Sequence, residues 1–215
     1  YNPDCLLLDD GFQHWKLARN LDVVVIDGMQ PFGNGGLVPA GILREPLSSL
    51  KRASLIILSR TDLCRPQEIQ TTKKHLDEIN SHIPVLEAVH HPLHLEDATG
   101  RCLETPWLRG KRLYAFCGIG NPKSFEKTLR LLGADIVRFK DFPDHHHYGR
   151  NELAAIDSEA SKLGVDAIVT TQKDFVKINA TPNQAWGKPI LSLRVEMRIT
   201  SGLDVLSKKL EEVFS

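Results

Sequence analysis

The sequence has no excess of charge of either sign and no apolar run long enough to span a membrane. Its 215 residues include 27 Lys and Arg and 27 Asp and Glu. A balanced charge supplies no overall field that would attract nucleic acid or an anionic membrane, so we expect no nucleic-acid partner. A transmembrane helix needs about 20 consecutive apolar residues, and no run here approaches that length. No signal peptide is visible either.

Closely spaced cysteine pairs are also missing. The four cysteines, at positions 5, 64, 102 and 117, are far apart, and no CxxC motif occurs. Cys5 and Cys117 lie in apolar, strand-like runs. This placement predicts packed, reduced thiols of the kind found in a cytoplasm-type compartment.

Apolar runs alternate with helical segments along the first part of the chain. Continuous apolar character, typical of parallel strands buried on both faces, occurs in residues 5–10, 21–27, 54–60 and 83–89. Helical spacing that begins with Pro66 predicts a helix as far as Ser81. Residues 90–111 are rich in turn formers, which predicts a β-hairpin linker.

A second α/β series follows the predicted linker. We expect strands at residues 112–117, 134–139, 166–171 and 189–195, and helices at 122–132, 150–164 and 201–214. The fold class is therefore α/β, with a parallel-sheet lobe over residues 1–89, a hairpin over 90–111 and a second, smaller α/β lobe over 112–215.

Two adjacent carboxylates, Asp9 and Asp10, end the first apolar run. In a Walker B strand, a carboxylate in this position holds Mg²⁺ beside the phosphates of a nucleotide. Adjacent acids repel each other, and a metal ion would offset that cost. Gln13 and His14 follow and add polar groups to the same loop. The alternative is that the two acids only cap the turn after the strand.

A Walker B motif needs a P-loop, GxxxxGK[ST], and the sequence contains none. The chain also begins with Tyr1 rather than Met. We therefore expect the chain to be the C-terminal part of a longer protein, with the phosphate-binding half upstream of Tyr1.

Arg44 and Asn121 are candidate anion ligands in two loops. Arg44 lies in a long loop rich in glycine and proline, residues 29–46, and its planar guanidinium suits a phosphate. It could instead form a surface pair with Glu45. Asn121 precedes Pro122 at a predicted helix start, where free N–H groups attract anions. Ordinary helix capping explains Asn121 equally well.

The segment FPDHHHYG, residues 142–149, is the densest group of ionisable side chains. A zinc site is disfavoured, because adjacent histidines cannot easily reach one ion and structural sites use spaced ligands. One histidine acting as partner of a general base is the favoured interpretation. Lys173, in the segment TTQKD, either contacts phosphate or belongs to the cap of a short helix.

Taken in order, these segments resemble the tetraacyldisaccharide 4'-kinase family of Gram-negative bacteria. The resemblance is carried by DDGFQHWKLARNLDVVVID, PFGNGGLVPAGILREP, FCGIGNPKSF, FPDHHHYG and TTQKD, and it covers nearly the whole chain. It implies a P-loop-kinase-like parallel-sheet lobe, incomplete here at its N-terminus, joined by a β-ribbon to a second α/β lobe. It also implies transfer of the γ-phosphate of ATP to the 4'-hydroxyl of a tetraacylated glucosamine disaccharide 1-phosphate in lipid A biosynthesis.

The resemblance implies roles for the candidate residues. Asp9 and Asp10 would be the acids at Mg²⁺, Arg44 an arginine near phosphate, and His145 the histidine that pairs with an upstream aspartate to activate the hydroxyl. The expected nucleotide-binding residues are Gln13, His14, Asn121 and Lys173.

Three features of the family are absent from the sequence: the N-terminal membrane-associating helix, the P-loop and the upstream aspartate that pairs with the histidine. We accordingly expect a parent protein that is peripheral on the cytoplasmic face of the bacterial inner membrane, and a fragment that is inactive alone. Two other functions stay open: a nucleotide-binding module without transferase activity, and a metal-dependent phosphohydrolase built on Asp9, Asp10 and the His145 cluster.

Overall fold

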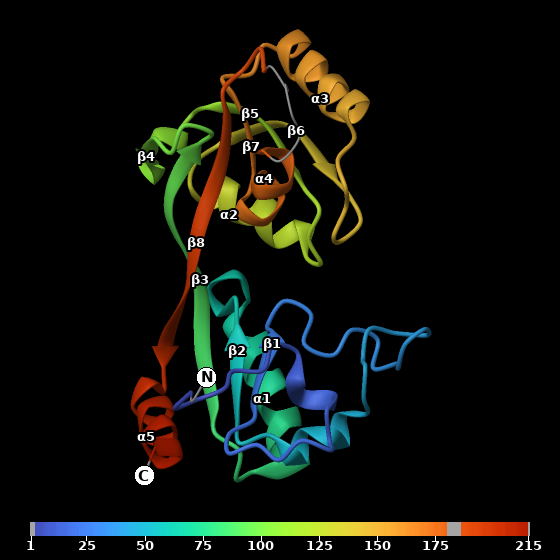
Figure 1. Ribbon diagram of the computed structural model, residues 1–215, viewed down its shortest axis with the longest axis vertical. Helices are drawn as coiled ribbons and strands as arrows, with labels where there is room; N and C mark the ends of the chain where they lie inside the picture. The colour runs from blue at the N-terminus through green and yellow to red at the C-terminus, as the bar shows by residue number, and fades with distance from the viewer. Residues whose placement is uncertain (1–2, 180–185, 215) are drawn as a thin grey trace. The chain divides into compact units, whose positions relative to one another are not determined.

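The structure is a computed structural model that describes residues 3–179 and 186–214 (Figure 1). The chain forms two compact units. Unit 1 comprises residues 1–89 and 198–215, and unit 2 comprises residues 90–197. The expected division placed the closing helix in the second lobe, whereas the structure groups this helix with unit 1. The reason is the packing of Val205 and Leu206 against the buried residues of unit 1.

Unit 1 is built on three parallel strand segments in the order β1-β2-β3. The strands are β1 (Val23–Asp27), β2 (Leu55–Ser59) and the first part of β3 (Val85–Asp97). The α-helices are α1 (Pro66–Asn80) and α5 (Leu203–Phe214), and the short 3₁₀ helices are η1 (Gly11–Gln13), η2 (Leu47–Arg52) and η3 (Thr61–Leu63).

The central strand β2 of unit 1 is buried on both faces, which explains its continuous apolar sequence. Ile56 and Leu58 pack on one face with Leu76 of α1. Leu55 and Ile57 pack on the other face, where α5 covers them. Each fully buried Leu or Ile contributes about 2 kcal/mol of hydrophobic free energy relative to an exposed one.

Unit 2 contains the parallel strand order β8-β7-β5-β6, with β3 and β4 paired as an antiparallel hairpin. Its strands are β4 (Cys102–Glu104), β5 (Arg112–Cys117), β6 (Asp135–Asp141), β7 (Ala167–Thr171) and β8 (Ile190–Ser201). Its helices are η4 (Thr105–Leu108), α2 (Pro122–Leu131), α3 (Arg150–Lys162) and α4 (Gln172–Asn179). Because β5, β6 and β7 are parallel, the loops that follow them lie at one edge of this sheet.

The first apolar run is not the buried strand that its sequence predicts. Residues 5–8 have no regular structure, and Leu6 and Leu7 are 78% and 94% exposed. A strand needs a hydrogen-bonding neighbour, and no strand within residues 3–179 and 186–214 pairs with this segment. Cys5 is exposed for the same reason, contrary to expectation, whereas Cys117 is buried as predicted.

The architecture confirms the predicted α/β class with a parallel-dominated sheet. The β3–β4 hairpin occupies part of the expected linker, and both β3 and β8 extend further than their apolar runs indicate. In the described part of the chain, no helix combines the length and apolar character needed to cross a bilayer.

Candidate functional site

Asp10 and Arg44, which are far apart in the sequence, form an ion pair in unit 1. Asp10 has a left-handed backbone with φ 55°, and one of its carboxylate oxygens lies 2.8 Å from Nη1 of Arg44. Both side chains are more than half exposed, at 74% and 61%. An exposed pair of this kind is held by less than about 1 kcal/mol. Each partner is therefore free to exchange the other for a ligand.

Gln13 and His14 line an open depression of about 690 Å³. The other lining residues are Leu8, Trp15, Lys16 and Leu17. Arg19 fixes this loop by donating hydrogen bonds to the carbonyls of Gly11 and His14, at 3.3 and 2.6 Å. Sequence reasoning missed Arg19, because its role depends on where the loop folds back and not on a motif of its own.

Glu45 anchors the Arg44 loop to the loop that carries Gln13 and His14. Its carboxylate accepts hydrogen bonds from Nε1 of Trp15 at 3.0 Å and from Nη2 of Arg52 at 2.7 Å. The Arg52 guanidinium in turn lies over the ring of Phe12, 4.5 Å from its centroid. Burial alone would raise the pKa of Glu45, but the hydrogen bonds from Arg52, Ser49 and Trp15 outweigh burial and hold it below its usual value. Glu45 is thus ionised and structural at neutral pH.

The adjacent carboxylates of Asp9 and Asp10 fit an ion such as Mg²⁺, although they do not form a complete protein site. In residues 3–179 and 186–214, no three His, Cys, Asp or Glu side chains are grouped to hold a metal. Mg²⁺ is usually bound by one or two carboxylates and by substrate phosphates, with water as the remaining ligand. Asp9 and Asp10, both exposed in one turn, offer this limited set of oxygens.

Asp144, His145 and Lys173 come together in unit 2. Nζ of Lys173 lies 3.0 Å from Oδ1 of Asp144 and 3.5 Å from Nε2 of His145. Nε2 of His145 lies 3.8 Å from the other carboxylate oxygen of Asp144. Burial alone would raise the pKa of Asp144, but the hydrogen bond and charge of Lys173 outweigh it and hold the pKa below its usual value. An anionic Asp144 therefore faces the exposed imidazole of His145.

The three adjacent histidines have different surroundings. The His146 ring stacks on Phe142 with ring centroids 4.6 Å apart, and its Nε2 lies 2.7 Å from Oε2 of Glu152. His147 is exposed, and His145 has a left-handed backbone with φ 62°. Left-handed backbone at a residue other than glycine is uncommon and occurs preferentially at functional sites. These differences favour one chemically active histidine over a shared metal site.

Asn121 has the capping role that was the alternative to ligand binding. Its Oδ1 accepts a hydrogen bond from the backbone N–H of Ser124 at 3.1 Å, at the start of α2. The loop that it ends, residues 118–121, follows β5 at the same sheet edge as His145 and Lys173.

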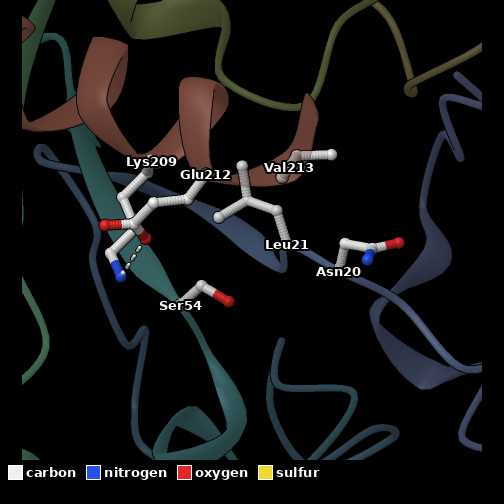
Figure 2. Close-up of a pocket in the computed structure, with 6 residues that line it drawn as sticks. All are labelled: Asn20, Leu21, Ser54, Lys209, Glu212 and Val213. Carbon is white, nitrogen blue, oxygen red and sulfur yellow. Dashed lines mark hydrogen bonds and ion pairs between the residues drawn. The ribbon is translucent and has the colours of Figure 1, made fainter. Parts of the chain in front are cut away.

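A separate cavity of about 210 Å³ lies at the amino ends of β1 and β2 (Figure 2). It is lined by Asn20, Leu21, Ser54, Lys209, Glu212 and Val213. Figure 2 shows α5 crossing above Leu21 and Ser54, with Lys209 paired to Glu212. None of the residues predicted from the sequence lines this cavity, so it is not the candidate site.

Comparisons of the sequence with known proteins all lead to one family. The family model described as "LpxK: Tetraacyldisaccharide-1-P 4'-kinase" matches residues 1–214. A tetraacyldisaccharide 4'-kinase from Anaeromyxobacter dehalogenans is 41% identical over 96% of this chain and 55% of that protein. One from Halothermothrix orenii is 38% identical over 83% of this chain and 49% of that protein. The chain spans about half the length of these relatives.

A solved structure has a similar fold. The crystal structure of "apo" form LpxK from Aquifex aeolicus in complex with ATP superposes with a TM-score of 0.61. The alignment covers 95% of this chain and 56% of that chain, at 24% sequence identity. This neighbour supports the predicted fold of the chain.

Proposed function

Because the chain belongs to the tetraacyldisaccharide 4'-kinase family, we propose that the full-length protein carrying it transfers the γ-phosphate of ATP to the 4'-hydroxyl of a tetraacylated glucosamine disaccharide 1-phosphate. The observation that carries the proposal is the family match over residues 1–214, which includes both groups of candidate residues. The solved structure of similar fold was determined in complex with ATP, which supports ATP as the donor.

In this proposal, the acids of unit 1 serve the nucleotide. Asp9 and Asp10 would hold Mg²⁺, and the ion would neutralise charge on the transferred phosphate when bound. Arg44 leaves Asp10 and binds phosphate oxygens with its planar fork of donors. Gln13 and His14, on the neighbouring loop, bind the nucleotide or its phosphates. The weak, exposed pairing of Asp10 with Arg44 makes such an exchange inexpensive in free energy.

The residues of unit 2 serve proton transfer and phosphate binding. His145 pairs with the upstream aspartate of the full-length protein and assists the removal of the proton from the 4'-hydroxyl. Within this chain, the carboxylate of Asp144 lies 3.8 Å from Nε2 of His145 and supports the imidazole. Lys173 holds Asp144 ionised and offers a positive charge to phosphate oxygens. Asn121 caps α2 and thereby fixes the loop after β5.

The acylated substrate supports a location at a membrane surface. We propose that the full-length protein is peripheral on the cytoplasmic face of the bacterial inner membrane and contacts it through a region outside this chain. Sedimentation of the full-length protein with vesicles of bacterial lipid tests this part. Protein that stays in the supernatant with and without vesicles would contradict it.

The transfer itself is tested with the purified full-length protein, ATP labelled on the γ-phosphate, Mg²⁺ and the disaccharide lipid. We expect label on the lipid, and none when the lipid is omitted. Release of phosphate from the lipid without ATP would indicate a metal-dependent phosphohydrolase. ATP binding without any turnover would indicate a nucleotide-binding module.

A further inference from the structure

Asp174, the third residue of α4, has a side chain with no exposed surface. Aspartate is almost never fully buried unless its carboxylate is paired, because removing its charge from water is strongly unfavourable. The hydrogen-bond partners of this carboxylate therefore indicate which parts of unit 2 it holds.

The partners of Asp174 come from a loop, the end of a strand and a helix. Its Oδ2 accepts hydrogen bonds from the backbone N–H of Gly118 at 2.9 Å and from the hydroxyl of Thr171 at 2.7 Å. Nζ of Lys177 lies 3.3 Å from its Oδ1. Gly118 follows β5, and Thr171 ends β7. One buried carboxylate thus ties the ends of two parallel strands together.

Lys177 extends this connection to the histidine segment. The same Nζ that pairs with Asp174 donates a hydrogen bond to the carbonyl of His146 at 3.2 Å. The carbonyl of Cys117 accepts a hydrogen bond from the N–H of Phe142 at 2.9 Å. The residues on either side of the Asp144–His145 pair are thereby fixed to β5 and α4.

Gly118 brings the first loop into close contact with the histidine segment. A Cβ atom at Gly118 would lie 3.0 Å from the hydroxyl of Tyr148 and 3.1 Å from Cβ of His146. Only glycine allows this approach without displacing either side chain. The negative charge of Asp174 also acts on Cys117, the residue before Gly118. Burial, and then the charge of Asp174, raise the pKa of the Cys117 thiol to about 12.

His145 itself has few contacts of its own. Its side chain is 76% exposed, and its polar neighbours are Asp144 and Lys173, the residue immediately before Asp174. The position of the imidazole is therefore set by the segment that carries it and by the start of α4. Asp174 holds both.

We propose that Asp174 is a positioning residue for His145: through Gly118, Thr171 and Lys177 it fixes the loops that place the Asp144–His145 pair for proton transfer. The inference rests on the proposed kinase function, in which His145 assists removal of the hydroxyl proton. It differs from a purely structural role, because the geometry lost with Asp174 matters to turnover only while His145 is present.

The test is a double-mutant cycle in the full-length protein, with Asp174→Asn and His145→Ala made singly and together. Asp174→Asn should lower kcat about tenfold or more and change the KM for ATP less than about threefold. In the His145→Ala background the same change should lower kcat no further, because residues that act as a unit are not additive. Asp166→Asn is the matched control. The carboxylate of Asp166 accepts a hydrogen bond from the backbone N–H of Arg112, at the opposite ends of β5 and β7. This control should keep full turnover.

Equal losses from Asp174→Asn with and without His145 would overturn the inference, as would unchanged kcat in the single variant. If His145→Ala alone has normal turnover while the wild type is an active kinase, the positioning role falls and the kinase function stands. If the wild type transfers no phosphate, the proposed function falls first. Should Asp174→Asn not fold, Thr171→Val and Lys177→Met in the same cycle decide, because each removes one bond to the carboxylate of Asp174 and keeps the carboxylate itself.

Discussion

Lys173 connects the end of β7 to the loop after β6, where its ammonium lies 3.0 Å from the carboxylate of Asp144. The contact brings residues from two separate sequence segments, TTQKD and FPDHHHYG, into one cluster with His145. It also keeps Asp144 anionic, because the hydrogen bond and charge of Lys173 outweigh the effect of burial on the pKa of that carboxyl.

The lowered pKa of Asp144 predicts a pH-dependent contribution to stability. A carboxyl whose pKa is lower in the folded state stabilises the protein above its unfolded-state pKa, and this contribution is lost as the pH falls through the folded-state value. Asp144→Asn should therefore lower Tm at about pH 7 more than at about pH 3. Lys173→Met should reduce the same pH dependence, and thermal unfolding across this range measures both. An equal change in Tm at every pH would contradict the prediction.

The three histidines should differ in their effect on catalysis. In the full-length protein, His145→Ala should lower kcat by about a hundredfold or more with little change in ATP affinity. His146→Ala should do less to turnover but should lower Tm, because the His146 ring stacks on Phe142 and pairs with Glu152. His147→Ala, at an exposed position, is the control for both. Equal losses of kcat at all three positions would favour a metal cluster or a structural role.

The acids of unit 1 should be needed for phosphate transfer. Asp9→Ala should remove most of the activity of the full-length protein, because metal placement acts mainly in the transition state. Steady-state rates over a range of Mg²⁺ concentrations measure the effect. Asp4→Ala removes an exposed carboxylate from the same segment and should leave the rate unchanged. Near-normal turnover in Asp9→Ala would rule out the metal role.

The cysteines provide a test of the fold. Cys117 is buried and its pKa is raised to about 12, first by burial and then by the charge of Asp174. Cys5 and Cys102 are exposed. Because the thiolate is the reactive form, iodoacetamide should modify Cys5 and Cys102 in the folded chain and Cys117 only after unfolding. Mass spectrometry of the modified peptides measures the order. Early modification of Cys117 would contradict the structure of unit 2.

Sequence patterns predicted the strands and helices whose apolar residues are buried in the structure. The run at residues 112–117 coincides with β5, and the helix predicted from Pro66 to Ser81 exceeds α1 by one residue at its end. The strand predicted at residues 5–10 was wrong. An apolar sequence indicates that a segment needs neighbours to pack against, but it does not show that the chain provides them. The part played by Asp174 could not be predicted, since its partner Gly118 lies 56 residues earlier and only the parallel strand order brings the two together.

The exposed first segment also predicts the behaviour of residues 1–215 alone. Leu6, Leu7 and Trp15 are more than two-thirds exposed, which favours association between copies. We expect this chain, purified alone, to aggregate at concentrations at which the full-length protein stays monodisperse. Light scattering of the two proteins at matched concentration tests this. A monodisperse solution of the isolated chain would contradict it.

The measurement that tests the kinase assignment most directly is the position of the transferred phosphate. Full-length protein is incubated with γ-labelled ATP, Mg²⁺ and the tetraacylated disaccharide 1-phosphate, alongside residues 1–215 alone, which contain no P-loop. We expect label on the 4'-oxygen with the full-length protein and none with residues 1–215, because the P-loop supplies much of the charge stabilisation in this reaction. No label on the lipid from the full-length protein, or clear 4'-phosphorylation by residues 1–215 alone, would contradict the account.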